Sequence, residues 1–534
     1  MRTGRPLIVV AALSIATTGA AYAFGPSGKP KSKPKPKPAS VSMPFAAAGA
    51  GMTSATTSCD PDPRRPKREL RGVWIATVKN IDWPSRAGLP IAQQKSEYTR
   101  ILDNAAARRL NAVFVQVRPA SDAFYKSPYE PWSQWLSGAP GKNPGWDPLP
   151  FLIEEAHKRG LEFHAWFNPY RAAASDTTPL PPRHPARLNP GWTVKHEGML
   201  YYNPGLPAVR EHVVKVITDV VKRYDVDGVH FDDYFYPYPG KGTPFADSAA
   251  FSKYGKGKSL AAWRRGNVNK LVAEVDKAVH DTKNYVKFGI SPFGIWRNKS
   301  NDPTGSATSG MSAYDSIYAD ARHWIRKGTV DYVLPQLYWP RGFKTADYNV
   351  LAPWWAKEVK GTDVQLYIGQ ALYQVGTTVN PAWKKPGELV DQINLNRKIG
   401  EIKGEVFFSA KQLGTNPLRV LDRISSTVYA RPALLPLMKD RGGQAPPPPA
   451  DLKQEGGNLT WASAQGATGY AVYRVQGEPG ACTTADARHL LAVEPAVAGT
   501  RQSFPLRGGG TYLVTSLDRL TNESKPTILA VKGS

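Results

Sequence analysis

The stretch DVDGVHFDDYFYPYPG, residues 225–240, decides the fold prediction. A short apolar run ends there on two adjacent aspartates, Asp232 and Asp233, and aromatic residues and prolines follow. Side chains alternate between the two faces of a β-strand, so His230 and Asp232 share one face and their apolar neighbours share the other. The pattern predicts a buried strand that delivers a carboxylate to one of its ends.

Similar apolar, β-rich runs recur along the central part of the chain, with amphipathic helical patterns between them. The runs are LRGVWIATV, NAVFVQVRP, LEFHAWFNPY, DGVHFDDYF, VKFGISPFGIW, VDYVLPQLYW, DVQLYIGQAL and GEVFFSAKQL. Eight strands alternating with helices predict an α/β fold, a (β/α)8 TIM barrel over residues 69–440. A doubly wound sheet is the competing fold, but it usually carries a Gly-rich phosphate turn after its first strand, and WIATVKNIDWPS contains none.

Polar residues fall on the inward face of four predicted strands. In a barrel one face of each strand meets the helices and the other points inward, and the C-terminal rim carries the chemistry of barrel enzymes. The inward polar residues are Gln116, Arg118, His164, Asn168, His230, Asp232, Gln336 and Tyr338. A single member of this set is readily explained as a hydrogen-bonded buried group, whereas four strands that share one rim favour a site.

Aromatic residues at the predicted strand ends favour a saccharide ligand, because a sugar has apolar faces and a hydroxylated edge. Arg118 or Arg171 would add a partner for a carboxylate-bearing or acylated saccharide. The candidate substrate-binding residues are Arg118, His164, Asn168, Tyr170, Arg171, His230, Tyr234, Trp296, Asn298, Gln336, Tyr338 and Trp339.

Glycoside hydrolysis usually requires two carboxyl groups. Asp232 is the candidate nucleophile or general base, and Asp233 is the second catalytic candidate if a turn at the rim brings it in. The alternative for Asp233 is a loop cap. Other possible acids lie in loops after the first, second and fifth strands: Asp82, Asp122, Glu130 and Asp302.

The two ends of the chain have different compositions from the centre. Residues 1–23 have a basic start, an apolar stretch and a small-residue cleavage pattern, which predict a signal peptide and a secreted protein, with an uncleaved anchor as the alternative. Residues 24–68 form a Lys/Pro-rich spacer predicted to be disordered. Residues 441–452 form a Pro-rich linker, and 453–534 show the strand alternation of a small β-sandwich domain that resembles a fibronectin type III module.

The formal net charge of +25 indicates anionic partners. In a secreted protein these are cell-wall polymers contacted through the Lys/Pro arm, not nucleic acid, and no stable membrane span is expected after signal cleavage. The nine histidines are scattered, which argues against a metal site, and no cofactor is expected. Cys59 and Cys482 could pair, but the sequence leaves this open.

Four motifs resemble one known family. RGVWIAT (71–77), DGVHFDDYFYP (227–237), SPFGIWRN (291–298) and DYVLPQLYW (331–339) occur in the order found in the glycosyl hydrolase-like 10 family. The resemblance covers about residues 69–440 and implies a glycosidase-type barrel acting on envelope glycans, with peptidoglycan strands the leading candidate and Asp232 matching the catalytic position. A non-catalytic glycan-binding wall protein on the same scaffold is the alternative.

Overall fold

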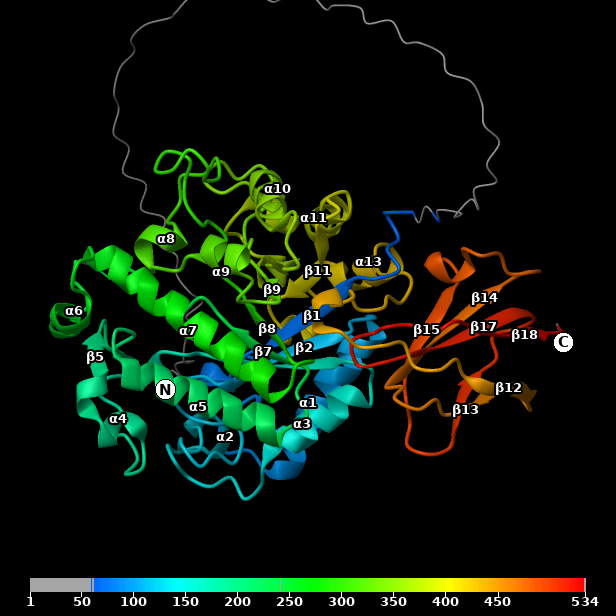
Figure 1. The fold of residues 1–534 in the computed structure, drawn as a ribbon, viewed down its shortest axis with the longest axis horizontal. Coiled ribbons are helices and arrows are strands. Elements are labelled where there is room, and N and C mark those ends of the chain that lie inside the picture. Colours follow the sequence, from blue (N-terminus) through cyan, green and yellow to red (C-terminus); the bar gives the residue numbers. More distant parts are fainter. Residues whose placement is uncertain (1–58, 60–61, 241, 533–534) are drawn as a thin grey trace, which may run out of the picture. The chain divides into compact units, whose positions relative to one another are not determined.

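The computed structural model describes Cys59, residues 62–240 and residues 242–532. The predicted signal peptide and most of the predicted spacer therefore lie outside the described residues. The central part of the chain is a closed parallel barrel, which confirms the predicted (β/α)8 fold (Figure 1). Around the barrel the strands are β1 (Leu70–Ile75), β2 (Ala112–Arg118), β3 (Glu162–Phe167), β7 (Gly228–Phe231), β8 (Lys287–Ile290), β9 (Tyr332–Val333), β10 (Gln365–Gln370) and β11 (Ile402–Phe407).

A helix follows each barrel strand before the next one begins. These helices are α1 (Ile91–Ala107), α3 (Pro148–His157), α5 (Pro207–Arg223), α7 (Leu260–Thr282), α9 (Ala321–Lys327), α10 (Tyr348–Val359), α11 (Glu388–Arg397) and α13 (Val420–Ser426). Shorter helices lie in the loops: α2 (Gln134–Ser137), α4 (Pro185–Leu188), α6 (Ser248–Tyr254), α8 (Ala313–Ser316) and α12 (Lys411–Thr415). Several of these helices begin with a side-chain N-cap. At the start of α7, for example, the side chain of Ser259 accepts a hydrogen bond from the amide of Ala262.

The barrel strands separate two layers of side chains, as the alternation predicts. On β2, Val113 and Val115 pack in the large cluster on the helix side, whereas Phe114 belongs to a second cluster inside the barrel. Space inside is tight: a Cβ at Gly228 would lie 2.3 Å from Nδ1 of His164. Glycine at 228 therefore makes room for a histidine ring on the neighbouring strand.

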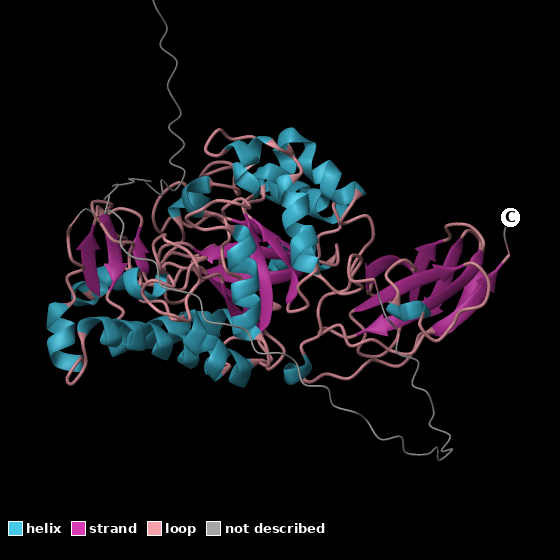
Figure 2. Ribbon diagram, turned by 90° about the horizontal axis from the view of Figure 1, so that it is seen from above, coloured by secondary structure: helices cyan, strands magenta, loops and turns pink. Residues whose placement is uncertain are grey.

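A small antiparallel sheet is inserted between β3 and α5 and was not predicted from the sequence. It consists of β4 (Arg171–Ala173), β6 (Met199–Tyr202) and β5 (Thr193–His196), paired in that order (Figure 2). The insertion begins at Arg171, three residues beyond the rim residue Asn168 that follows β3. It thereby brings Arg171 next to the carboxyl ends of the barrel strands.

The C-terminal domain is a β-sandwich. One sheet contains β12 (Ala450–Glu455), β13 (Asn458–Ala462) and β16 (Arg501–Pro505), and the other contains β15 (Leu490–Pro495), β14 (Gly469–Val475), β17 (Gly510–Leu517) and β18 (Thr527–Val531). Buried residues of both sheets form one cluster, in which the rings of Trp461 and Tyr470 lie 5.3 Å apart. Strand β12 begins at Ala450, inside the segment predicted as linker.

The segment before β1 is attached to both folded domains. Cys59 and Cys482 form a disulfide with a Cα–Cα distance of 5.5 Å, which answers the question that the sequence left open. Lys67 pairs with Glu523 at 2.5 Å, and the guanidinium of Arg68 donates to the carbonyl of Leu435 at 2.8 Å. The last residues of the predicted spacer are therefore part of the folded structure.

No helix within the described part of the chain combines the length and the apolar character that a bilayer span requires.

Candidate active site

Strand β7 ends at Phe231, and the turn after it carries two adjacent carboxyls at the C-terminal rim. Asp232 lies on the inward side, as the alternation predicts: its Oδ2 accepts hydrogen bonds from Trp166 Nε1 (3.1 Å) and Asn168 Nδ2 (3.2 Å). Both donors come from β3 and its extension. Its Oδ1 accepts from the amide of Tyr234 at 3.2 Å, so Asp232 is held by contacts on both oxygens.

Asp233 does not continue the alternation of the strand, because the chain turns after Phe231. Its Oδ1 accepts a hydrogen bond from Gln336 Nε2 at 2.9 Å, and its Oδ2 accepts from the hydroxyl of Tyr238. Gln336 lies on the extension of β9, so the turn directs Asp233 across the rim towards another strand. The two carboxyls therefore belong to one site, and both are almost fully buried.

The electrostatic surroundings of the pair raise both pKa values. Burial raises the pKa of Asp232 to about 7, with the charge of Asp233 as the second cause and Arg171 acting in the opposite direction. Burial also raises the pKa of Asp233, whereas its hydrogen bonds from Tyr238 and Gln336 lower it. Near neutral pH, Asp232 is thus poised to exchange a proton.

Arg171 supplies positive charge beside the carboxyls. Its guanidinium lies over the ring of Tyr234, 4.4 Å from the centroid, and its Nε is buried without a hydrogen-bond partner. It makes no ion pair with any residue that the structure describes, although its charge lowers the pKa of both aspartates. This cation therefore remains available to an anionic group of a ligand.

Aromatic rings surround the same rim. Tyr234 and Tyr238 lie with their ring centroids 5.5 Å apart, and Trp339 packs edge-on against Phe293 at 5.5 Å. Tyr234, Tyr338 and Trp339 are only partly buried, so part of each ring is open to solvent. Partly exposed aromatic faces beside carboxyls suit a saccharide.

Two predicted histidines lie below the rim. His230 lies inside the barrel, where its Nε2 accepts from Trp74 Nε1 at 3.2 Å, and burial holds its pKa well below the usual range. His164 lies deeper and stacks on Phe114, with ring centroids 4.4 Å apart. Neither histidine has exposed surface, so the structure places both behind the rim and away from the open end, whereas the sequence predicts them among the substrate-binding residues.

Arg118 was predicted to face inward, and the structure places it elsewhere. The β2–β3 register shifts between Gln116 and Arg118, so Arg118 is paired with Phe167, which faces the helices. Its guanidinium is fully buried and forms a two-point ion pair with Glu130, at 2.7 and 2.6 Å. The irregularity in β2 therefore turns Arg118 to the helix side of the barrel. There Arg118 forms a structural ion pair with Glu130.

Three further predicted residues lie outside the site. Tyr170 is fully buried in the cluster on the helix side. Trp296 is 5% exposed and stacks on Trp354, with its Nε1 donating to Asp320 at 3.0 Å. Asn298 closes its own loop, because its Nδ2 donates to the carbonyl of Gly310 at 2.7 Å.

The other possible acids make their hydrogen bonds and ion pairs outside the pair Asp232 and Asp233. Arg118 and His212 hold the pKa of Glu130 far below its usual range, against the effect of burial. Asp302 lies in an exposed turn where Thr304 lowers its pKa. Burial raises the pKa of Asp82 and of Asp122 to about 6, but Asp82 accepts three hydrogen bonds that join the loops after β1 and β11.

Four residues that contact the site or its support were not predicted as site residues: Trp74, Trp166, Tyr238 and Ser291. Trp166 had a usable signal, because it lies between His164 and Asn168 on the same inward face of β3. Tyr238 belongs to the aromatic run after Asp233, but only the turn shows which ring reaches the carboxyl. Across Cys59, residues 62–240 and residues 242–532, no three His, Cys, Asp or Glu side chains are grouped to hold a metal ion.

Comparison with known proteins identifies relatives of this chain. The sequence pattern described as "Glycosyl hydrolase-like 10" matches residues 69–385. The glycosyl hydrolase YngK of Bacillus subtilis (strain 168) is 47% identical over 473 residues, which cover 86% of this chain and 92% of that protein. The glycosyl hydrolase DigH of Escherichia coli (strain K12) is 40% identical over 362 residues, covering 64% of this chain and 82% of that protein.

Proposed function

Because the chain belongs to the glycosyl hydrolase-like 10 family, we propose that it is a secreted glycoside hydrolase of cell-envelope polysaccharide, with peptidoglycan glycan strands as the leading substrate. The observation that carries this proposal is the pair Asp232 and Asp233 at the barrel rim. Two carboxyls in one site are what glycoside hydrolysis requires. The partly exposed rings around them supply surfaces for sugar faces.

The environments of the two carboxyls suggest separate roles. The sequence leaves Asp232 as nucleophile or general base, and its pKa of about 7 favours proton transfer at neutral pH. Asp233 accepts hydrogen bonds from Tyr238 and Gln336, which favour its ionised form. In this proposal Asp232 moves the proton and Asp233 supplies the second carboxylate, which stabilises or attacks the positively charged sugar carbon.

Arg171 and the aromatic rings support the choice of substrate class. An unpaired guanidinium beside the carboxyls suits a saccharide that carries its own carboxylate. The glycan strands of peptidoglycan carry a lactyl carboxylate on every second sugar once their peptides have been removed. A glycan without such groups would leave this buried cation unpaired.

The test uses the chain without residues 1–23 and purified peptidoglycan, both intact and peptide-stripped. We expect the wild type to release soluble saccharides from the stripped strands, detected by mass spectrometry. Asp232→Asn should release none above background, while it still co-sediments with the glycan. Release by the variant at the wild-type rate would assign the proton transfer to another group.

The second candidate function is glycan binding without cleavage. Its supporting observation is the near-complete burial of both carboxyls, which are 4% and 3% exposed and already hydrogen-bonded. A binding protein would co-sediment with the strands as the wild type and as Asp232→Asn, and neither form would release fragments. The same experiment thus separates the two candidates.

Secretion and the roles of the terminal regions belong to the same proposal. The predicted signal peptide and the Lys/Pro arm suit export and contact with anionic wall polymers. The C-terminal sandwich contains sheets of three and four strands, and its assignment to the fibronectin type III class remains a prediction.

A further inference from the structure

A continuous chain of hydrogen bonds runs inside the barrel, away from the rim. His230 Nδ1 lies 3.1 Å from the hydroxyl of Tyr332, and the same hydroxyl lies 3.0 Å from Nδ1 of His164. On its other side, His164 Nε2 lies 3.2 Å from Oε2 of Glu162, whose Oε1 pairs with Lys287. All five side chains are buried, and they come from strands β3, β7, β8 and β9.

One fixed donor sets the proton order of the chain. The indole nitrogen of Trp74 can only donate, so Nε2 of His230 accepts and the neutral ring carries its proton on Nδ1. The Nδ1 proton is donated to Tyr332, and the single hydroxyl proton of Tyr332 is then donated to Nδ1 of His164. His164 consequently carries its proton on Nε2 and donates it to Glu162, an ionised carboxylate because Lys287 lowers its pKa against burial.

The upper end of the chain supports the candidate active site. The hydroxyl of Ser291 lies 3.1 Å from His230 Nε2 and donates to the carbonyl of Phe231 at 3.3 Å, and the carbonyl of Ser291 accepts from Gln336 Nε2 at 2.9 Å. The same nitrogen of Gln336 donates to Asp233. Trp74 lies on the same side, because a Cβ at Gly369 would contact both its ring and the backbone of Gln336 at 3.1 Å.

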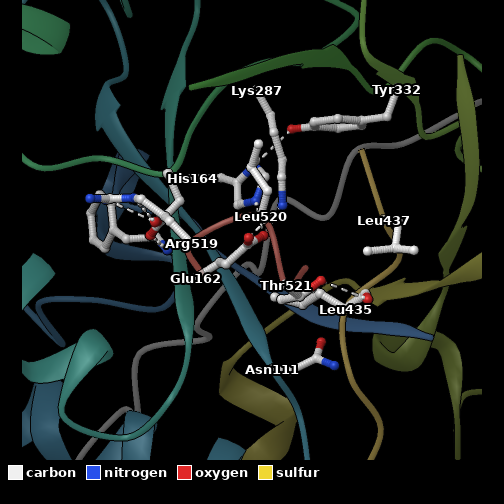
Figure 3. Close-up of polar contacts among 12 residues, drawn as sticks. Asn111, Glu162, His164, Lys287, Tyr332, Leu435, Leu437, Arg519, Leu520 and Thr521 are labelled. Atoms are coloured by element: carbon white, nitrogen blue, oxygen red, sulfur yellow. Dashed lines mark hydrogen bonds and ion pairs between the residues drawn. The ribbon is translucent and has the colours of Figure 1, made fainter. Parts of the chain in front are cut away.

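At the lower end, the C-terminal domain contributes an ion pair beside the chain of hydrogen bonds. Arg519 pairs with Asp227 at 2.8 Å, and Asp227 accepts from the backbone amide of Phe163 between Glu162 and His164. Figure 3 shows Arg519 and its neighbours in the turn of this domain, together with Glu162, His164, Lys287 and Tyr332. The chain of hydrogen bonds thus ends at the ion pair of Glu162 and Lys287 on one side and at the indole of Trp74 on the other.

We propose that Tyr332 is a positioning residue for the proposed hydrolysis: its hydroxyl joins the two histidines in one proton order and so holds Ser291 and Gln336 in place under Asp233. The inference rests on the proposed function, because it assigns Tyr332 to the support of that site. Tyr332 itself has no exposed surface, so a substrate at the rim does not reach it.

The test removes the hydroxyl with Tyr332→Phe and uses Tyr367→Phe as the matched control. Tyr367 belongs to the same inner cluster and its ring lies 5.4 Å from that of Tyr332, but its hydroxyl donates to Gln365, outside the chain. Nitrogen-15 chemical shifts of the histidine rings report which nitrogen carries the proton. Saccharide release gives kcat and KM for each variant.

In the wild type we expect a proton on Nδ1 of His230 and on Nε2 of His164. Tyr332→Phe should give a mixture of the two neutral tautomers of each histidine. It should lower kcat by about tenfold and change KM by no more than about twofold, because it loosens the support of the site without removing a contact to substrate. Tyr367→Phe should leave the histidine shifts and kcat unchanged. A folded Tyr332→Phe with wild-type kcat, or the opposite proton order in the wild type, would overturn the proposal.

Failure of the proposed function is recognisable separately. If the wild type releases no saccharide, both the proposed hydrolase function and the positioning role of Tyr332 are wrong. The nitrogen-15 chemical shifts of the histidine rings would still show the proton order. If the wild type is active but the nitrogen-15 shifts show a different proton order, the proposed function is retained and the proposed order of hydrogen bonds is wrong.

Discussion

The side-chain amide of Gln336 donates to Asp233 at 2.9 Å and thereby connects the extension of β9 to the turn after β7. The two residues are 103 positions apart in the sequence, and this contact turns the second carboxyl towards the site. The bond also lowers the pKa of Asp233, which burial raises. Gln336 therefore influences both the direction and the charge of a proposed catalytic group.

The first prediction follows from this contact. Gln336→Leu removes the donor, so the pKa of Asp233 rises and its ionised fraction near neutral pH falls. We expect kcat to drop by about 10- to 100-fold, the range of one lost hydrogen bond to a charged group, and the acid limb of the pH–rate profile to move to higher pH. Gln365→Leu is the control, because Gln365 donates to the carbonyl of Leu437. Equal profiles for the two variants would contradict the role of Gln336.

The second prediction concerns Arg171. Arg171→Met keeps most of the length of the side chain and removes the charge, so affinity for peptide-stripped strands should fall by about 10- to 100-fold. Strands whose carboxylates have been converted to amides should bind the wild type and the variant equally, because they offer the guanidinium no charge. Calorimetric titration of both ligands gives the comparison. A similar loss of affinity for both ligands would show that Arg171 supports the site without reading the charge of the substrate.

The barrel and much of the rim could be predicted because they depend on local patterns. The alternation of β7 placed His230 and Asp232 on the inward face, and the structure confirms it. Arg118 could not be placed in the same way, because one irregularity in the β2–β3 pairing reverses its side. Sequence alternation does not indicate such an extra residue.

Other parts of the site depend on contacts between distant segments. The direction of Asp233 depends on Gln336, and the position of Arg171 depends on an inserted sheet with no strong sequence pattern. Trp296 shows the opposite case: it follows a barrel strand as an exposed binding residue would, but Trp354 of α10 covers its ring. In these cases the tertiary partner decides the role of the residue.

The third prediction addresses the C-terminal domain. Arg519 of this domain pairs with Asp225 and with the buried Asp227, which lie just before β7. Arg519→Ala removes one partner of Asp227, which keeps His157 and the amide of Phe163. We expect the free energy of unfolding to fall by about 1–3 kcal/mol, less than for a fully buried pair, because Arg519 is 23% exposed.

Urea unfolding measures this loss, and Arg488→Ala is its control. Arg488 pairs with Asp486 in the same domain, but its side chain is 62% exposed, so its removal should change stability much less than the removal of Arg519. Equal effects of the two substitutions would show that Arg519 does not stabilise the barrel. A larger loss for Arg519→Ala than for Arg488→Ala would show that the C-terminal domain stabilises the barrel through this ion pair.

The last prediction uses the raised pKa of Asp232. A carboxyl with a pKa of about 7 in the folded state and 3.8 in the unfolded state binds more protons when folded between these values, so its contribution to stability falls as pH rises from 4 to 7. The pKa difference of about three corresponds to at most about 4 kcal/mol. Asp232→Asn has no such charge. Its stability relative to the wild type should therefore rise by up to that amount between pH 4 and pH 8, measured by urea unfolding at each pH. Asp302→Asn should show no such rise, because the pKa of Asp302 is lowered in the folded protein, so the stability that its charge contributes is already present above pH 4 and is lost only at lower pH. A stability difference for Asp232→Asn that does not change with pH would show that Asp232 is already ionised at low pH, and the proton-transfer role would then pass to another carboxyl.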